Sequence, residues 1–230
     1  MEAKESADKD TKPACGVGTL HGTPATLSMK DLKETIKFPS SILLIGKKFS
    51  GKTNLLRNII DRKKFNNVFV ITLSGHTGNL TSLATDPENI IQGINDDIID
   101  FIIEFQLANK KSKTCIIFDD FIDSERTLRA VPKIMMLATS GRNFGISLVI
   151  SSQTVAQVPT AVRKNAEYLF IGKNMMSSAD QLSREYATAQ LGIKELKKEI
   201  IDIQDHSWLM YDERVCKWSK IPQDEIKVFV

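Results

Sequence analysis

Residues 46–53 read Gly46-Lys47-Lys48-Phe49-Ser50-Gly51-Lys52-Thr53. This run is a complete match to GxxxxGK followed by Ser or Thr, the Walker A motif or P-loop, and it lies between an apolar run and a helical pattern. In such a loop, glycines let backbone N–H groups surround phosphate oxygens, and the positive end of the following helix points at them. We therefore expect residues 46–53 to bind a nucleotide, with Lys52 reaching the β- and γ-phosphates and Thr53 binding Mg²⁺.

Phe49 makes this loop unusual, because many loops of the same kind carry Gly at that position. We expect the chain to hold this bulky residue in an ordinary backbone conformation. The alternative interpretation of residues 46–53 is a plain glycine turn between a strand and a helix. The apolar run Ser41–Ile45 just before the motif argues against that alternative.

Beyond the loop, short apolar runs alternate with helical patterns. The predicted strands are Ser41–Ile45, Val68–Leu73, Thr114–Phe118, Ile146–Ser152 and Tyr168–Gly172. The predicted helices are Lys52–Asp61, Asp96–Asn109, Ser124–Thr139 and Ser177–Gln190, with a short helix between Leu27 and Phe38 and a late β-hairpin from Ser207–Tyr211 and Arg214–Trp218. Nearly continuous apolar strands are typical of parallel strands buried on both faces. The pattern predicts a three-layer α/β P-loop fold with a mostly parallel central sheet.

A second motif follows the third predicted strand, where four apolar residues end in Asp119-Asp120 (Walker B). We expect Asp119 to hold Mg²⁺ through water and Asp120 to orient and deprotonate the attacking water. The alternative is that this acidic pair begins a loop that caps a helix at Ser124. The extra strand Val68–Leu73 between the two motifs favours the catalytic interpretation. It also excludes kinase-like and GTPase-like folds and predicts the additional-strand class, with strand order 5-1-4-3-2.

Gln153 ends the strand that this class places between the P-loop strand and the acidic strand. Its side chain would then touch the γ-phosphate or its water, although a strand that simply ends in polar residues looks the same. Arg142 and Arg163 lie before and after that strand. Either could stabilise transition-state charge in a neighbouring subunit as an arginine finger, and either could be a solvated surface charge.

Composition limits the remaining choices. The excess of 31 Lys and Arg over 28 Asp and Glu gives a net charge of +3, which neither requires nor excludes a nucleic-acid partner. Basic clusters could contact a phosphate backbone but are more often solvated, and they are Arg62–Lys64, Lys110–Lys113 and Lys194–Lys198. Residues 1–25 predict a flexible tail, and residues 26–230 predict a single P-loop ATPase domain.

Targeting signals and cysteine pairing are not expected. The apolar runs are far shorter than the ~20 residues that a spanning helix needs, so we expect a soluble protein with no membrane partner. Three cysteines, odd in number and far apart, predict neither a disulfide framework nor a zinc ribbon, which is typical of a reducing intracellular compartment.

From Phe38 to Lys217 the order of motifs resembles the poxvirus-type genome-packaging ATPases of large DNA viruses, virophages and related elements, within the FtsK–HerA superfamily. The resemblance is carried by the P-loop, the paired aspartates, Gly141-Arg142-Asn143, Gln153, the Val158–Arg163 stretch and the closing hairpin. It departs at Phe49 and at Asp120, where many members have Glu.

The resemblance implies an ATP- and Mg²⁺-dependent motor that threads double-stranded DNA into a preformed capsid. It further implies a homo-oligomeric ring of five or six subunits, a capsid or portal partner, and a location in the host cytoplasm, the virus factory or the virion. Lys52, Thr53, Asp119, Asp120 and Gln153 would serve one subunit, and Arg142 or Arg163 its neighbour. Other DNA-transfer or helicase-like ATPases, a nucleoside kinase, and a capsid-assembly factor with little turnover are the alternatives. The kinase is disfavoured, because no arginine-rich lid follows Gln153, and the lack of an NKxD sequence favours ATP over GTP.

Overall fold

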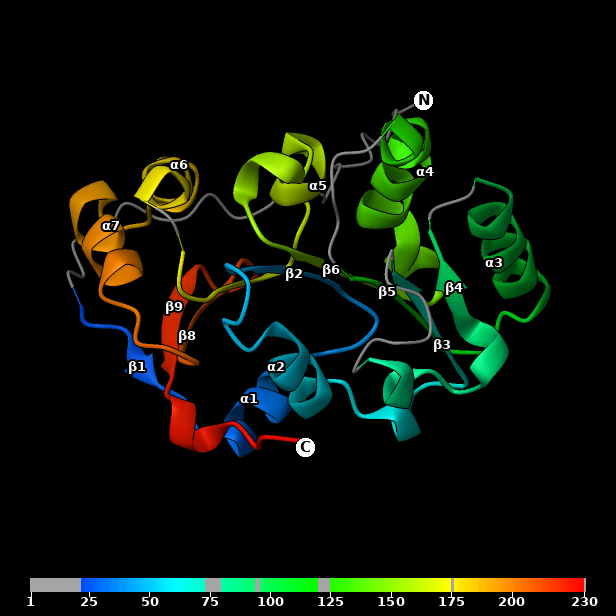
Figure 1. The fold of residues 1–230 in the computed structure, drawn as a ribbon, viewed down its shortest axis with the longest axis horizontal. Coiled ribbons are helices and arrows are strands. Elements are labelled where there is room, and N and C mark those ends of the chain that lie inside the picture. The colour runs from blue at the N-terminus through cyan, green and yellow to red at the C-terminus, as the bar shows by residue number, and fades with distance from the viewer. Residues whose placement is uncertain (1–21, 73–79, 94–95, 120–124, 175, 230) are drawn as a thin grey trace, which may run out of the picture.

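The structure is a computed structural model that describes residues 22–72, 80–93, 96–119, 125–174 and 176–229. In this part of the chain a central sheet lies between two layers of helices (Figure 1). The strands are β1 (Ala25–Thr26), β2 (Ser41–Ile45), β3 (Asn67–Thr72), β4 (Ile90–Gln92), β5 (Thr114–Asp119), β6 (Ile146–Ser152), β7 (Tyr168–Ile171), β8 (Trp208–Asp212) and β9 (Lys217–Ile221). The α-helices are α1 (Met29–Thr35), α2 (Lys52–Ile59), α3 (Asp96–Ala108), α4 (Glu125–Ser140), α5 (Thr160–Lys164), α6 (Met176–Tyr186) and α7 (Ile193–Ile201).

The sheet has the order β1-β9-β8-β7-β2-β6-β5-β3-β4. Its middle, β7-β2-β6-β5-β3, consists of the five predicted apolar runs, all parallel and in the predicted order 5-1-4-3-2. The additional-strand P-loop fold is therefore confirmed. The predicted hairpin is also present, because β8 pairs antiparallel with both β7 and β9.

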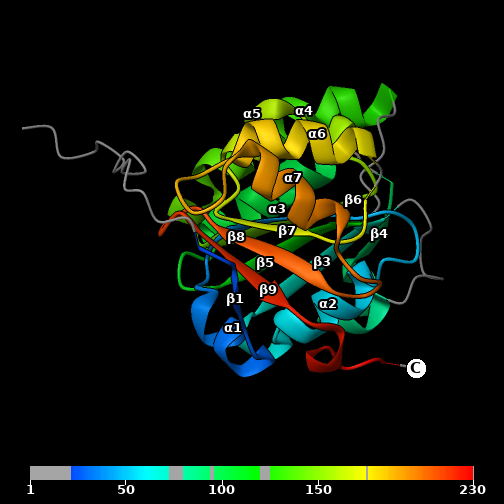
Figure 2. The ribbon, with the colours of Figure 1, turned by 90° about the vertical axis from the view of Figure 1, so that its left-hand side faces the viewer.

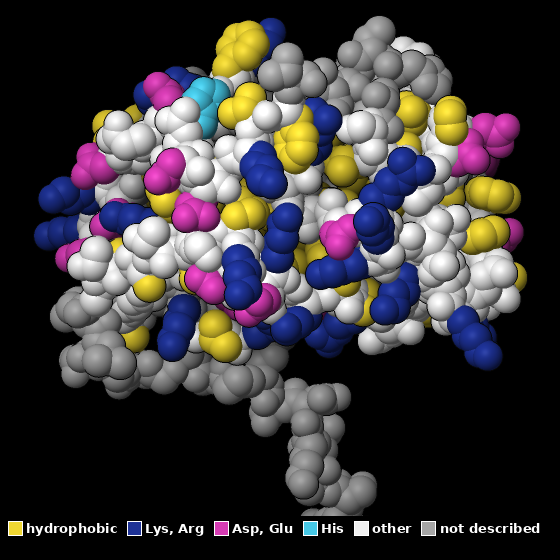
Figure 3. Space-filling view, turned by 90° about the horizontal axis from the view of Figure 1, so that it is seen from below, with side chains coloured by type: hydrophobic (Ala, Val, Ile, Leu, Met, Phe, Trp, Pro, Cys, Tyr) yellow, Lys and Arg dark blue, Asp and Glu magenta, His cyan; other side chains and the backbone are white. Residues whose placement is uncertain are grey.

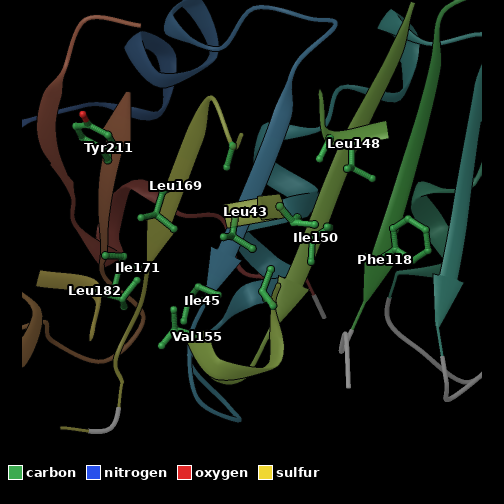
Figure 4. Close-up of a cluster of buried hydrophobic side chains, with 14 of the residues drawn as sticks. Leu43, Ile45, Phe118, Leu148, Ile150, Val155, Leu169, Ile171, Leu182 and Tyr211 are labelled. Carbon is green, nitrogen blue, oxygen red and sulfur yellow. The ribbon is translucent and has the colours of Figure 1, made fainter. Parts of the chain in front are cut away.

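The central strand β2 is buried over its whole length, and its side chains alternate between two cores. Leu43 and Ile45 enter the cluster that also contains residues of α3, α4 and α6, and Ile42 and Leu44 enter the cluster with residues of α1 and α2. Figure 4 shows the first pair beside Ile150 of the neighbouring strand. Burying one such side chain contributes about 1.5–3 kcal/mol, so the parallel core is where the stability of the fold is concentrated.

The two helical layers cover opposite faces of the sheet, with α1 and α2 on one side and α3 to α7 on the other (Figures 1 and 2). The C-terminal segment returns to the first layer. There the buried Asn58 of α2 donates to the carbonyl oxygen of Lys227 over 2.9 Å and accepts from the N–H of the same residue over 3.2 Å. This exchange of two hydrogen bonds ties the end of the chain to the helix that follows the P-loop.

Several boundaries differ from the sequence expectations. Neither α5 nor α7 was predicted; α7 buries Leu196 and Ile200 within a lysine-rich segment that looks solvated. The hairpin turn lies at residues 213–216 instead of 212–213, because Asp212 still pairs with Tyr168 of β7 and with Lys217 of β9. Ala25, expected in a flexible tail, pairs with β9 as part of β1. The rest of the predicted tail, except residues 22–24, lies outside the described residues.

One of the three cysteines lies in the hydrophobic core. Cys115 on β5 is free and buried, and burial raises the pKa of its thiol. Within the described part of the chain, every helix is too short or too polar to span a lipid bilayer.

Candidate active site

Three adjacent strands bring the predicted catalytic segments to one edge of the sheet. The N–H of Gly46, after β2, donates to the carbonyl oxygen of Ser152 over 3.1 Å. Gln153 therefore lies beside the start of the P-loop. On the far side of β6, β5 ends at Asp119. The strand of Gln153 therefore lies between the P-loop strand and the acidic strand, as predicted. Asp120 lies outside the described residues, and its role stays a prediction.

The loop of residues 46–53 has the features of a phosphate site. Lys52 is buried, and its Nζ donates to the carbonyl oxygens of Gly46 at 2.8 Å and Lys47 at 3.3 Å. Gly51 precedes α2 in the left-handed region, with φ +88°, and no side chain caps the amino end of that helix. The hydroxyl of Ser50 is buried and has no hydrogen-bond partner among the described residues. A buried unsatisfied hydroxyl and an uncapped helix end suit an oxyanion ligand such as phosphate.

Phe49 corrects the expectation of an ordinary backbone conformation. Its φ is +66°, in the left-handed region, and its side chain is 83% exposed with Lys48 Nζ 5.1 Å from the ring centroid. A non-glycine residue in this region costs roughly 1–2 kcal/mol. The path of the loop thus overrides the backbone preference of Phe49.

The hairpin supplies neighbours of the P-loop that the sequence did not indicate. Trp208, at the start of β8, packs so closely that a Cβ added to Gly172 would lie 2.9 Å from its ring, and one added to Gly46 would lie 3.3 Å away. Nδ1 of His206 would lie 3.0 Å from a Cβ on Gly51. Because these contacts join residues more than 150 positions apart in two of the three cases, no local pattern could have predicted them.

The two candidate arginines occupy different environments. Arg142 precedes β6, whereas Gln153 follows it, and a strand of seven residues spans about 23 Å. Arg142 is therefore at the edge opposite the P-loop, where its exposed guanidinium donates to Glu167 over 2.9 Å. Burial raises the pKa of Glu167, and Arg142 opposes that shift. Both residues line a hollow of about 590 Å³ at this edge.

Arg163 is a structural residue in this fold. It is 4% exposed and makes a bidentate pair with Glu185, at 2.9 and 2.6 Å. It also donates to the carbonyl oxygens of Val155 and Val158. These bonds hold the crossover between β6 and β7, whereas the side chain of Arg142 is exposed.

The predicted magnesium ligands fit the arrangement. Thr53 is the second residue of α2, and Asp119 ends β5, so both lie at the P-loop edge. The described residues contain no group of three or more His, Cys, Asp or Glu side chains that could hold a metal alone. Mg²⁺ is usually bound by one or two carboxylates together with the phosphate oxygens of a nucleotide, a pattern that Thr53 and Asp119 fit.

The basic clusters do not mark one binding track. Arg62–Lys64 forms a short 3₁₀ helix on the α1–α2 side of the sheet, whereas Lys194–Lys198 belongs to α7 on the other side. Seen from the α1–α2 side, Lys and Arg side chains are spread over the surface with Asp and Glu among them (Figure 3). We therefore assign no DNA-contacting residues.

Comparisons with known proteins agree with this architecture. By sequence, no protein-family model and no curated protein matches the chain. By structure, it is similar to the genome packaging NTPase B204 from Sulfolobus turreted icosahedral virus 2 in complex with ATPγS, with a TM-score of 0.59 and 18% identity over 80% of this chain and 98% of that chain. It is also similar to ATPases 2 and 3 of EssC from Geobacillus thermodenitrificans (TM-score 0.52, 13% identity, 92% of this chain and 46% of that chain). EccC from Thermomonospora curvata, in complex with a signal sequence peptide, matches with a TM-score of 0.53 and 14% identity over 88% of this chain and 40% of that chain. The chain thus has the fold of P-loop NTPases.

The environments of the arginines predict different losses of stability. Replacing Arg163 by Met removes the cation that pairs with Glu185 and the donor to two carbonyl groups, and we expect it to lower the free energy of unfolding by about 3 kcal/mol. Replacing the exposed Arg142 by Met is the matched control and should cost less than about 1 kcal/mol. Urea denaturation measures both, and equal losses would contradict the structural assignment of Arg163.

The backbone at Phe49 predicts a second contrast. Gly accepts φ +66° without strain, so Phe49→Gly should match or exceed the stability of the original protein. Phe49→Val places a β-branched residue in the same conformation and should lower the free energy of unfolding by more than about 1 kcal/mol. Thermal unfolding of the two variants checks this order, which an ordinary φ at residue 49 would not produce.

Proposed function

We propose that this chain is a Mg²⁺-dependent ATPase that translocates double-stranded DNA and packages a viral genome into a preformed capsid. The observation that carries the proposal is the convergence of the P-loop, Asp119 and Gln153 on adjacent strands in the order of additional-strand ATPases. The choice of ATP and of packaging is supported by the similarity to a genome packaging NTPase in complex with ATPγS.

The residues divide the chemistry of phosphoryl transfer among them. Lys52 would neutralise the β- and γ-phosphates from the loop, and Thr53 and Asp119 would hold Mg²⁺, which offsets charge on the same phosphates. Asp120 would accept the proton of the attacking water, and Gln153 would position that water. Each role follows from the place of the residue at the P-loop edge or, for Asp120, from its place in the sequence.

We further propose a homo-oligomeric ring, of five or six subunits, with Arg142 acting on the nucleotide of a neighbour. Arg142 is supported over Arg163 because it is exposed and lies far from its own P-loop. A capsid or portal protein would be the partner that holds the ring at the entry point of the DNA.

A motor that moves polypeptides is the second candidate function. It is favoured by the similarity to secretion ATPases, one of them in complex with a signal sequence peptide. The two candidates differ in what stimulates turnover, because a motor hydrolyses ATP fastest when its own cargo is engaged.

Steady-state ATP hydrolysis with and without linear double-stranded DNA tests the proposal. We expect turnover to rise with DNA and with protein concentration. Lys52→Ala should lower it at least about 100-fold, and Asp120→Asn should bind ATP but hydrolyse it at least about 100-fold more slowly. Turnover that does not change with DNA but rises with an unfolded polypeptide would support the secretion alternative. Robust hydrolysis by Lys52→Ala would contradict the assignment of the P-loop as the ATPase site.

Subunit mixing tests the role of Arg142. An Arg142→Ala protein and a Lys52→Ala protein should each be inactive, and a mixture should regain measurable turnover because their defects lie on opposite sides of an interface. Arg184→Ala, which changes an exposed arginine on α6, is the control and should stay active on its own. A mixture as inactive as its two components would remove Arg142 from the neighbouring site.

A further inference from the structure

The strand order determines in which direction a bound nucleotide must lie. The P-loop follows β2, Asp119 ends β5 and Gln153 follows β6. Both β5 and β6 lie on one side of β2. On the other side of β2 lie β7 and then β8. If the γ-phosphate faces Asp119 and Gln153, as the proposed function requires, the ribose and base must extend toward the carboxyl end of β7 and the amino end of β8.

The segment at the ends of β7 and β8 is tied directly to the P-loop. The N–H of Lys47 donates to the carbonyl oxygen of Lys173 over 2.9 Å. Lys173 Nζ in turn makes an ion pair with Asp205 at 2.9 Å, and this pair holds the pKa of Asp205 below its usual value. On the same side, Asn174 Nδ2 donates to the carbonyl oxygens of Ile45 and Gly172 at 3.1 and 2.6 Å. The rim of the P-loop on this side is therefore built from the segment that follows β7 and the segment that precedes β8.

His206 presents an exposed ring on this rim. Its backbone is in the left-handed region, with φ +61°, and it is one of three non-glycine residues with positive φ among the described residues. The other two are Phe49, within the P-loop itself, and Cys216, in the hairpin turn. Strained backbone of this kind is concentrated at functional sites.

The position of the ring next to Gly51 brings it within reach of a nucleotide. A Cβ on Gly51 would lie 3.0 Å from Nδ1 of His206, so the imidazole lies close to the backbone of Gly51. Gly51 is also the residue just before α2, where the phosphates are expected to bind. A planar ring beside the phosphate loop, on the side away from Asp119, can stack on the face of a base.

We infer that His206 forms one wall of the base subsite, with its imidazole stacked on the nucleobase of the bound nucleoside triphosphate. This inference rests on the proposed function, because it takes the P-loop to be the triphosphate site. Stacking on a side-chain ring is tolerant of base identity. His206 therefore contributes affinity for adenine and guanine nucleotides alike.

Binding measurements with ligands that carry or lack a nucleobase test this assignment. Isothermal titration calorimetry would compare ATPγS, GTPγS and inorganic tripolyphosphate, which lacks both base and ribose. Removing the ring in His206→Gly should weaken both nucleotides by about 5-fold or more, and should leave tripolyphosphate affinity within about twofold. His206→Phe keeps a ring and should restore most of the lost nucleotide affinity.

Two controls distinguish loss of the base subsite from loss of the whole nucleotide site and from misfolding. Lys52→Ala should weaken all three ligands, because it removes the phosphate contact they share. Gly suits φ +61°, so His206→Gly should unfold at the same temperature as the original protein or higher.

Other binding results would overturn the assignment of His206. Equal weakening of ATPγS and tripolyphosphate in His206→Gly would place His206 at the phosphates and overturn the base subsite, as would unchanged affinity for all ligands. Original protein that binds none of the three ligands, or Lys52→Ala protein that binds them all normally, would overturn the nucleotide site and the subsite with it.

Discussion

The parallel pairing of β2 with β6 on one side and β7 on the other is the constraint on which the rest of the structure depends. All five residues of β2 are buried, and every one of them pairs with β6. This pairing fixes where the strand ends and therefore where the P-loop begins. The N–H of Gly46 continues the ladder by donating to Ser152, so the loop and Gln153 are held in one register. A shift of β2 by one residue would exchange its two core faces and move the loop away from Gln153.

The antiparallel hairpin adds a second support that acts at the same place. Trp208 packs against the backbone of Gly46 and Gly172, and the Lys173–Asp205 pair joins the two strand ends beside it. The P-loop is thus held by β6 on the side of Gln153 and by β7 and β8 on the other. Under the proposed function, an edge that is asymmetric in this way would give a bound triphosphate one direction, with its γ-phosphate toward Asp119 and its base toward His206.

The sequence predicted the five central strands because each is a short apolar run that needs no distant partner to be recognised. It predicted their order because the extra strand between the two motifs indicated the additional-strand class. It did not predict β1, β4, α5 or α7. The first two are strands of two and three residues that exist through pairing with β9 and β3. In α7, four apolar residues among lysines and glutamates were too few to distinguish a packed helix from a solvated one.

At the candidate site, the sequence indicated residues that belong to local motifs and gave no sign of those that come from elsewhere in the chain. Lys52, Asp119 and Gln153 follow strands, and their meeting at one edge follows from the parallel order. Trp208 and His206 reach the loop only because β8 lies next to β7, which a local pattern does not encode. Arg142 and Arg163 look alike in sequence, and only burial, hydrogen bonding and position in the fold separate them.

The most direct test of this account is a crystal structure with a non-hydrolysable ATP analogue that carries bromine on its base, grown with Mn²⁺ in place of Mg²⁺. Anomalous scattering would then locate both ends of the nucleotide in one experiment. The account predicts a manganese peak between Thr53 and Asp119 and a bromine peak beside His206, over the ends of β7 and β8. A bromine peak on the β5 side of the P-loop, or both peaks in the hollow near Arg142, would contradict it.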